Sequence, residues 1–441
     1  MTGKTILELV ETAIRSADPY SAVRRSLSCR DGTLYIEGNA FEAGSRVHVL
    51  AVGKAACGMA KAALEVLPGD SIGSVLVVTK YGYTFDGCKG TGLKAIEAGH
   101  PIPDENSLLA GKLGLELVAS VKRDEVLLAL ISGGGSALFV YPAEGISLGD
   151  LIRTNELLLK SGANIYEVNT VRKHISKVKG GRLAKAVKGT VIGLLVSDVV
   201  GDDPSFIASG LTVPDPTTYH DAYGVLVKRR IWERVPESVR RVIEMGMRGE
   251  IEETPKELDN AHNFVIAGNS KACEAVARKA LELGFNSAVM TTTLEGEARE
   301  IALAVGSIVE EVAKRERPLK KPAVLVFGGE WTVTVGNATG LGGPNQEFAL
   351  SISKKIAGLN VTVVAFDTDG TDGPTNAAGG IVDGGTLKRL EEAGIDVDEF
   401  LRNHDSYRAL ERVGALLKTG PTGTNVNSMV IAVVGDRGDA L

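Results

Sequence analysis

The chain has 441 residues, 44% of them hydrophobic and 24% charged, which is enough for roughly two or three globular domains. Its formal net charge of −6 argues against a surface that coats nucleic acid. No run approaches the roughly 18 apolar residues of a membrane-spanning helix, and no apolar leader precedes a cleavage site. We therefore expect a cytoplasmic protein that binds neither nucleic acid nor membrane.

Four cysteines are spread along the chain, at Cys29, Cys57, Cys88 and Cys273. They form no C-x-x-C pair and no zinc pattern. So few thiols in so long a chain favour reduced cysteines over a disulfide framework.

Apolar runs alternate with helical segments along the first half of the chain. An opening helix is expected over residues 5–25, and strands are expected at 47–52, 75–79, 126–131 and 190–196. Such alternation is typical of βαβ units and a parallel sheet. The runs are apolar throughout, as expected for strands that are covered on both faces.

The second half resumes this alternation after a charged segment, 229–259, which we interpret as helices that cross or close a domain. Apolar runs then recur at 264–267, 287–291, 323–327, 361–366 and 428–434. We expect an α/β fold of two domains, residues 1–245 and 246–441, with a cleft between them.

Gly53 and Lys54 directly follow the first strand and open a helix. A helix N-terminus offers unpaired N–H groups and partial positive charge, and a lysine there adds a compact cation. The full phosphate-loop pattern is absent. Anion binding and a solvated lysine are therefore both compatible with the sequence.

A glycine-rich turn follows the strand at 126–131, and its residues are Ser132, Gly133, Gly134, Gly135 and Ser136. Three consecutive glycines let backbone N–H groups turn inward around phosphate or carboxylate oxygens. Neither G-x-G-x-x-G nor G-x-S-x-G is present. The turn favours an anion site over a tight turn without a ligand.

A basic segment runs through Arg172, Lys173, Lys177 and Lys179. If it is helical, Lys173 and Lys177 share one face, and Arg172 and Lys179 share another. Like charges this close favour an anionic ligand, and arginine can bind a carboxylate or phosphate through two hydrogen bonds. A solvated basic helix face is the alternative.

Three polar residues stand at other element ends. Asp198 is the first carboxylate after the strand at 190–196, so it could be a general base or a metal ligand. Glu330 ends a strand and Asn345 starts a helix, and both could face a nucleotide or substrate. A plain helix cap or turn explains them equally well.

The loop after the strand at 361–366 holds three carboxylates, Asp367, Asp369 and Asp372. Their mutual repulsion needs an offset, which a divalent cation or a basic substrate group would supply. Oxygen ligands suit Mg²⁺, which takes one or two carboxylates and leaves other positions to water and phosphate. A solvated turn built from Asx-turns is the alternative.

Taken in order, these motifs resemble the glycerate 2-kinase family, whose C-terminal part is the MOFRL domain. The resemblance covers nearly the whole chain and rests on residues 51–55, 99–104, 132–138, 171–176, 179–184, 197–202, 209–215, 328–330, 367–373 and 422–425. It implies a larger Rossmann-like N-terminal domain, a smaller C-terminal α/β domain and an active site in the cleft between them.

The resemblance also implies ATP-dependent phosphorylation of D-glycerate at its 2-hydroxyl, with a divalent metal. The family's functional lysine falls on Lys54. The arginine of its G-G-R-N-Q-E motif is replaced here by Pro344, which cannot supply a cation. The oligomeric state is left open, with a homodimer among the options.

These residues suggest a mechanism. Asp369 and Asp372 would hold Mg²⁺ against the ATP phosphates. Lys54 and the glycine-rich turn would bind a phosphate or the glycerate carboxylate, and Arg172 and Lys173 would neutralise the opposing anion. Asp198 would accept the proton of the 2-hydroxyl.

Two rival hypotheses come from other classes. One is an oxidoreductase acting on hydroxypyruvate or tartronate, against which the missing dinucleotide fingerprint counts. The other is a metabolite sensor without catalytic activity.

Overall fold

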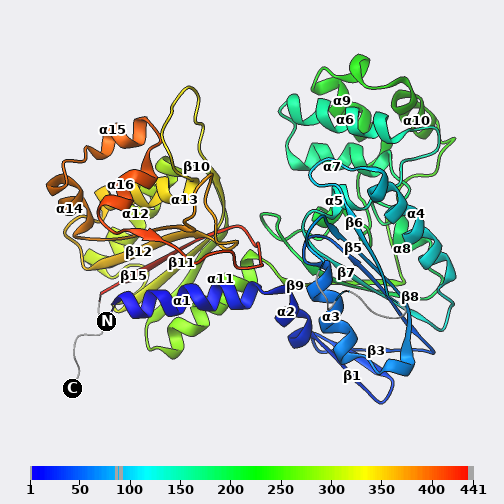
Figure 1. The fold of residues 1–441 in the computed structure, drawn as a ribbon, viewed down its shortest axis with the longest axis horizontal. Helices are drawn as coiled ribbons and strands as arrows, with labels where there is room; N and C mark the ends of the chain where they lie inside the picture. The colour runs from blue at the N-terminus through cyan, green and yellow to red at the C-terminus, as the bar shows by residue number, and fades with distance from the viewer. Residues whose placement is uncertain (1, 85–87, 89–92, 436–441) are drawn as a thin grey trace. The chain divides into compact units, whose positions relative to one another are not determined.

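The computed structural model describes residues 2–84, 88 and 93–435 (Figure 1). The chain divides into two compact units, each of which is described separately below. We call them the parallel-sheet unit, Pro19–Ser197 with Asp203–Ile266, and the mixed-sheet unit, Met1–Asp18, Asp198–Asp202 and Ala267–Leu441. This division differs from the expected domains 1–245 and 246–441. The first helix and the 198–202 segment pack within the mixed-sheet unit, whereas a strand after residue 245 extends the parallel sheet.

The parallel-sheet unit is built on a six-stranded sheet with the order β6-β5-β4-β7-β8-β9. Its pairings β6–β5, β5–β4, β4–β7 and β7–β8 are all parallel. This doubly wound order reverses between β4 and β7, which is where such folds bind ligands. The strands are β4 (Val47–Val52), β5 (Ile72–Lys80), β6 (Leu93–Ala98), β7 (Val126–Ile131), β8 (Thr190–Val196) and β9 (Ala261–Ala267).

Helices and a small sheet complete this unit. The small antiparallel sheet holds β1 (Leu27–Arg30), β2 (Thr33–Ile36) and β3 (Asn39–Glu42). A group of helices, α6, α7, α9 and α10, encloses an apolar core of its own (Figure 1). The helices are α2 (Pro19–Ser26), α3 (Ala56–Val66), α4 (Glu105–Ser120), α5 (Gly135–Leu138), α6 (Leu148–Lys160), α7 (Ile165–His174), α8 (Arg182–Lys185), α9 (Tyr219–Lys228) and α10 (Glu237–Met247).

The mixed-sheet unit has a six-stranded sheet with the order β10-β11-β15-β12-β13-β14. Only β10 and β11 pair in parallel, and the other neighbours are antiparallel. The strands are β10 (Asn286–Glu297), β11 (Ala323–Thr332), β12 (Val361–Asp367), β13 (Gly379–Asp383), β14 (Leu416–Leu417) and β15 (Ser428–Val434).

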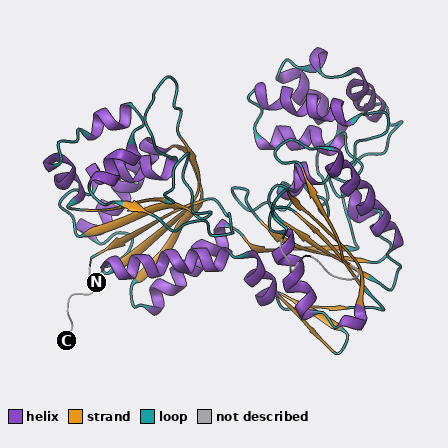
Figure 2. Ribbon diagram, in the orientation of Figure 1, coloured by secondary structure: helices purple, strands orange, loops and turns teal. Residues whose placement is uncertain are grey.

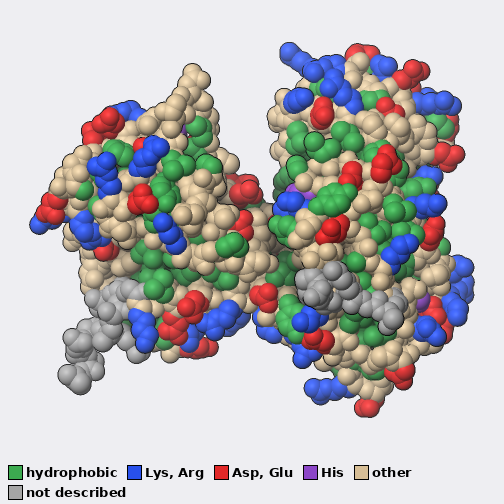
Figure 3. Space-filling view, viewed as in Figure 1, with side chains coloured by type: hydrophobic (Ala, Val, Ile, Leu, Met, Phe, Trp, Pro, Cys, Tyr) green, Lys and Arg blue, Asp and Glu red, His purple; other side chains and the backbone are tan. Residues whose placement is uncertain are grey.

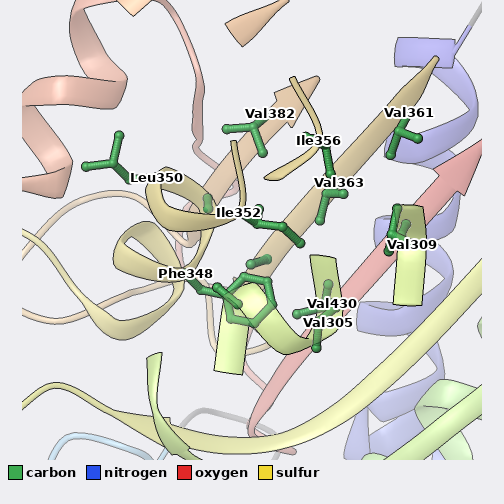
Figure 4. Close-up of a cluster of buried hydrophobic side chains, with 14 of the residues drawn as sticks. Val305, Val309, Phe348, Leu350, Ile352, Ile356, Val361, Val363, Val382 and Val430 are labelled. Atoms are coloured by element: carbon green, nitrogen blue, oxygen red, sulfur yellow. The ribbon is translucent and has the colours of Figure 1, made fainter. Parts of the chain in front are cut away.

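Helices cover both faces of this mixed sheet (Figure 2). Leu325 and Phe327 pack with α12 and α13, whereas their neighbours Val324 and Val326 pack with α1 and α11. Figure 4 shows part of the first core, around Phe348, in which helix and strand side chains meet. Continuous apolar runs are therefore needed, because successive strand residues face opposite covered sides. The helices are α1 (Thr2–Ala17), α11 (Asn269–Glu282), α12 (Ala298–Arg315), α13 (Pro344–Lys355), α14 (Thr386–Glu392), α15 (Val397–Arg402) and α16 (Ser406–Arg412).

The expected opening helix over 5–25 is two helices, α1 and α2, that meet at Asp18 and Pro19. Pro19 has no N–H and restricts the residue before it, so a continuous helix is interrupted there. The two helices also belong to different units.

A disulfide joins Cys57 to Cys88, with Cα atoms 5.6 Å apart, whereas Cys29 and Cys273 are free thiols. The prediction of reduced cysteines is therefore wrong for this pair. The two residues are 31 positions apart, and only the fold brings the start of α3 to Cys88.

Charged side chains of both signs are interspersed on the face shown in Figure 3. Within the described residues, none of the helices combines the length and the apolar character needed to cross a membrane.

Candidate active site

Lys54 and the glycine-rich turn meet at the switch point of the parallel sheet. They follow β4 and β7, which are neighbours in register from Val47 opposite Val126 to Val52 opposite Ile131. The Lys54 N–H donates to the Gly133 carbonyl at 2.9 Å, and the Ala55 N–H donates to Ser132 Oγ at 3.1 Å. The Lys54 loop and the glycine-rich turn, each considered as an anion site from the sequence, are thus hydrogen-bonded to each other.

Glycine is required in this structure for two reasons. Gly53 and Gly134 both have positive φ, +128° and +85°, a region that other residues rarely adopt. A Cβ on Gly53 would also overlap Ser132 Oγ. The backbone of one loop therefore lies directly against the other.

His100 also reaches the glycine-rich turn, although the sequence motifs did not single out its side chain as a site residue. A Cβ on Gly134 would lie 3.2 Å from both His100 Cδ2 and Lys54 Cγ, so these two side chains converge on that glycine. Burial, followed by the positive charges of Lys54 and Lys80, lowers the pKa of His100. Its imidazole is therefore neutral at neutral pH and can offer both a donor and an acceptor.

A network of buried polar side chains is hydrogen-bonded to Ser136 of the glycine-rich turn. Ser136 Oγ and Ser209 Oγ share a hydrogen bond of 2.8 Å, and Ser209 Oγ donates to Asn169 Oδ1 at 2.7 Å. Lys179 Nζ donates to the Ser136 carbonyl at 2.8 Å. Sequence reasoning named Ser136 as a site residue and Lys179 only within the basic segment, and it did not single out Asn169 or Ser209. The Lys179-Gly-Gly-Arg string was the available signal for the lysine.

The basic segment divides into paired and unpaired cations. Lys173 is buried, and its Nζ lies 3.3 Å from Asp215 Oδ1, so its charge is already matched within the protein. Arg172 Nε donates to Asn155 Oδ1 at 2.8 Å. Among the described residues, no carboxylate forms an ion pair with Arg172 or Lys179. Arg172 therefore fits the predicted anion role, and Lys173 fits it less well.

The acidic loop of the mixed-sheet unit is partly a helix cap. Asp372 Oδ1 accepts the Asn345 N–H at 3.0 Å, and Asp372 Oδ2 accepts the Gln346 N–H at 2.8 Å. These donors begin α13, whose first residue, Pro344, needs no N–H partner. Burial raises the pKa of Asp372 to about 6, although these hydrogen bonds oppose the rise.

Asn345 is buried in the same cap. Its Nδ2 donates to Asp372 Oδ1 at 3.1 Å and to Ser428 Oγ at 3.0 Å, so it ties the loop to β15. The structure thus gives Asn345 a supporting role beside the loop, and its predicted contact with substrate stays a prediction.

Asp367 and Asp369 stand at the more open part of the loop. Burial, and then the negative charge of Asp369, raises the pKa of Asp367 to about 7. Asp369 Oδ1 accepts the Thr371 N–H at 2.7 Å in an Asx-turn, as the alternative interpretation of the loop predicted. Within 2–84, 88 and 93–435 no group of three His, Cys, Asp or Glu side chains is arranged to hold a metal ion.

Asp198 and Glu330 are brought near each other in the mixed-sheet unit. Desolvation, followed by the negative charges of Asp198 and Glu295, raises the pKa of Glu330. Glu295 faces Glu330 directly in the β10–β11 register. Asp198 and Glu295 thus place negative charge beside Glu330 at this edge of the sheet.

Two family models match this chain. A domain of unknown function (DUF4147) matches residues 5–244, and the MOFRL family matches residues 323–428.

Individual relatives match it over almost their full lengths. A glycerate 2-kinase from Pyrococcus horikoshii is 58% identical over 98% of this chain and 97% of its own. A protein from Agrobacterium vitis, named provisionally as a hydroxypyruvate reductase, is 40% identical over 98% of this chain and 94% of its own. The crystal structure of a glycerate kinase from Thermotoga maritima has 45% identity and a TM-score of 0.87, covering 98% of this chain and 99% of that one.

The sequence motifs, the doubly wound sheet with Lys54 at its switch point and these full-length matches all agree. The chain belongs to the glycerate 2-kinase family.

Proposed function

We propose that this protein transfers the γ-phosphoryl group of ATP to the 2-hydroxyl of D-glycerate, giving 2-phosphoglycerate and ADP. The observation that carries the proposal is the 58% identity to a glycerate 2-kinase over 98% of the chain. The contact between the Lys54 loop and the glycine-rich turn supports it, because phosphoryl transfer depends on positioned positive charge more than on covalent chemistry.

Residue roles follow from the geometry of each unit. Lys54 and the N–H groups of the turn at Gly133, Gly134 and Gly135 would bind anionic oxygens at the switch point. Arg172 would neutralise charge there. Asp198, beside Glu330 and Glu295, would accept the proton of the acceptor hydroxyl.

Magnesium is the expected metal, and the acidic loop fits it in part. Burial first, and then repulsion by Asp369, raises the pKa of Asp367, and a bound cation would relieve that repulsion. Asp369 and Asp367 are better placed than Asp372, whose oxygens accept helix N–H groups. When bound, Mg²⁺ would neutralise charge on the phosphate oxygens. The cytoplasmic location and the homodimer stay predictions from the sequence.

The test is ATP-to-ADP turnover with D-glycerate and Mg²⁺, with the product passed to enolase. We expect enolase alone to respond, because only 2-phosphoglycerate is its direct substrate. A response that requires phosphoglycerate mutase would mean phosphorylation at the 3-hydroxyl and would contradict the proposed regiochemistry. Lys54→Met is the matched inactive variant, and we expect it to lower kcat/KM by about a hundredfold or more.

A reductase is the second candidate because of the Agrobacterium vitis relative. The Gly53-Lys54 loop after β4 lacks the glycines that a dinucleotide pyrophosphate needs. Loss of NAD(P)H absorbance on mixing with hydroxypyruvate would favour the reductase. A ligand-induced thermal shift without turnover would favour the sensor hypothesis.

A further inference from the structure

Two cations of the parallel-sheet unit, the buried Lys179 and the half-buried Arg172, have no carboxylate partner among the described residues. Lys179 is 2% exposed, and its Nζ donates to the carbonyls of Ser136 and Phe139 at 2.8 and 3.4 Å. Arg172 acts on it through its positive charge. None of the ion pairs within the described residues involves either side chain. An unmatched buried charge is costly, so this pair indicates a ligand that supplies negative charge.

Asn169 gives an independent indication of the same ligand. This side chain is 1% exposed, and its Oδ1 accepts from Ser209 Oγ. Its Nδ2 is buried and has no hydrogen-bond partner within the described residues. Buried N–H groups are almost always paired, so a donor left open one helical turn from Arg172 on α7 is suited to an acceptor oxygen.

The geometry of Arg172 leaves its guanidinium available for that acceptor. Asn155 takes only the Nε hydrogen, at 2.8 Å, and orients the planar group. The terminal N–H groups make no hydrogen bond within the described residues. Two parallel N–H groups of this kind match the two oxygens of a carboxylate.

Charge balance favours a carboxylate over the donor phosphates. A nucleoside triphosphate binds with a divalent cation, which offsets much of its charge before it reaches the protein. A small hydroxy acid brings no cation, so the positive charge beside its carboxylate has to come from the protein. Lys173 cannot serve, because Asp215 already pairs with it.

We propose that Lys179, Arg172 and Asn169 form the subsite for the carboxylate of the acceptor, with Lys179 as a positioning residue that also holds the glycine-rich turn. This assignment rests on the proposed function, and it replaces Lys173 by Lys179 in the role expected from the sequence.

Acceptor binding is then coupled to protonation of Lys179. Burial, and then repulsion by Arg172, lowers the pKa of Lys179 to about 7 in the free protein. A bound carboxylate favours the charged lysine, so it raises this pKa and draws a proton from solvent near neutral pH. The acceptor binds best below about pH 7 and more weakly above it, by up to about tenfold per pH unit for one linked proton.

Calorimetric titration of the full-length protein with D-glycerate tests the coupling. At about pH 8, in two buffers of different ionisation enthalpy, we expect uptake of up to about one proton. The KM for D-glycerate should rise between about pH 7 and pH 9 in the wild type. In Lys179→Met that KM should be at least about tenfold higher, with the KM for ATP within about twofold.

Lys179→Arg is the conservative variant, and it can be measured in place of Lys179→Met if that variant does not fold. Arginine keeps the charge but does not titrate, so proton uptake should disappear while D-glycerate affinity is retained above pH 7. His100 is unchanged in both variants, so pH dependence that remains in Lys179→Arg does not come from residue 179. Lys177→Met is the matched control, since Lys177 is exposed and pairs with Glu144. It should leave the KM and proton uptake unchanged.

Three results would overturn the inference. They are D-glycerate binding without proton uptake, a KM in Lys179→Met within about twofold of wild type, and proton-linked binding of inorganic phosphate alone that competes with ATP. Failure of the proposed function is distinguishable, because calorimetry needs no turnover. Carboxylate binding with proton uptake would support the subsite even without ADP formation.

Discussion

Asp369 and Asp372 lie three residues apart in one loop, yet their carboxylates have different surroundings. Both oxygens of Asp372 accept N–H groups at the start of α13. Asp369 uses Oδ1 in a local turn and is half-buried. A helix-capping carboxylate contributes to stability, whereas a carboxylate at an open loop can bind a ligand.

The two aspartates should therefore respond differently to removal of charge. We expect Asp372→Asn to lower the thermal midpoint, because one acceptor of the cap becomes an amide donor and α13 loses a contribution of about 1 kcal/mol. We expect Asp369→Asn to change the Mg²⁺ concentration needed for half-maximal activity, with little change in stability. Thermal unfolding and Mg²⁺ titration of both variants measure this. Equal metal dependence in wild type and Asp369→Asn would contradict the metal role.

At the scale of the element, α7 carries Asn169 and Arg172 and is held at its start by Glu167. The Asn164 side chain caps the helix, and the Glu167 carboxylate in turn accepts a hydrogen bond from the Asn164 N–H at 3.0 Å. Glu167 also accepts hydrogen bonds from Lys228 and Arg229 at the end of α9. One carboxylate thus fixes the helix that presents the proposed anion site.

Glu167 should make stability depend on pH in the acid range. Hydrogen bonds from Arg229 and then Lys228 lower its pKa from 4.5 to about 2. A depressed carboxylate pKa contributes stability that is present above the unfolded value and is lost as pH falls toward the folded value. Glu167→Gln should lower Tm by roughly 2–4 °C at neutral pH, the shift expected for about 1 kcal/mol. The difference should shrink between about pH 4.5 and about pH 2.

The control for this pH series is Glu156→Gln on α6, where the carboxylate is 42% exposed. It should leave Tm nearly unchanged across the same range. A Glu167→Gln deficit that persisted unchanged at low pH would assign the loss to packing rather than charge.

At the scale of the whole molecule, each unit has its own cores, and the chain passes between the units more than once. The Cys57–Cys88 disulfide lies within the parallel-sheet unit. A bond of this kind stabilises the unit that contains it by restricting its unfolded state.

Reduction should therefore shift one unfolding transition and spare the other. For residues 31 positions apart, the chain-entropy relation gives about 3–4 kcal/mol. Calorimetry with and without reductant should show a lower midpoint for the parallel-sheet unit only. Cys57→Ser with Cys88→Ser should reproduce the effect, and Cys29→Ser should not. The free thiols would be alkylated before the reductant is added. A thermogram that does not change on reduction would then contradict the bond.

Much of the fold could be predicted from the sequence because it follows from local patterns. The runs at 47–52, 126–131 and 190–196 are strands as expected, since their length, apolar character and bounding glycines are properties of adjacent residues. The convergence of Lys54 with the glycine-rich turn also followed, because loops after parallel strands share one edge.

The remaining features depend on residues far apart in the chain. Helical spacing grouped Lys173 with Lys177 and Arg172 with Lys179, but α7 ends at His174, so that spacing does not reach Lys177 or Lys179. Asp215, 42 positions beyond Lys173, pairs with Lys173, whereas Lys179 has no carboxylate partner among the described residues. Likewise, a local acidic cluster predicted a metal site that includes Asp372. In the structure, the Asp372 carboxylate instead accepts an N–H group at the start of α13.

The sequence by itself determined the family and the succession of strands and turns, including the position of Lys54 after β4. Only the tertiary structure decided which charges are matched within the protein and which cysteines are bonded. The physical reason is that burial and charge pairing depend on distances in space, and sequence spacing fixes those distances only within a helix, a strand or a turn.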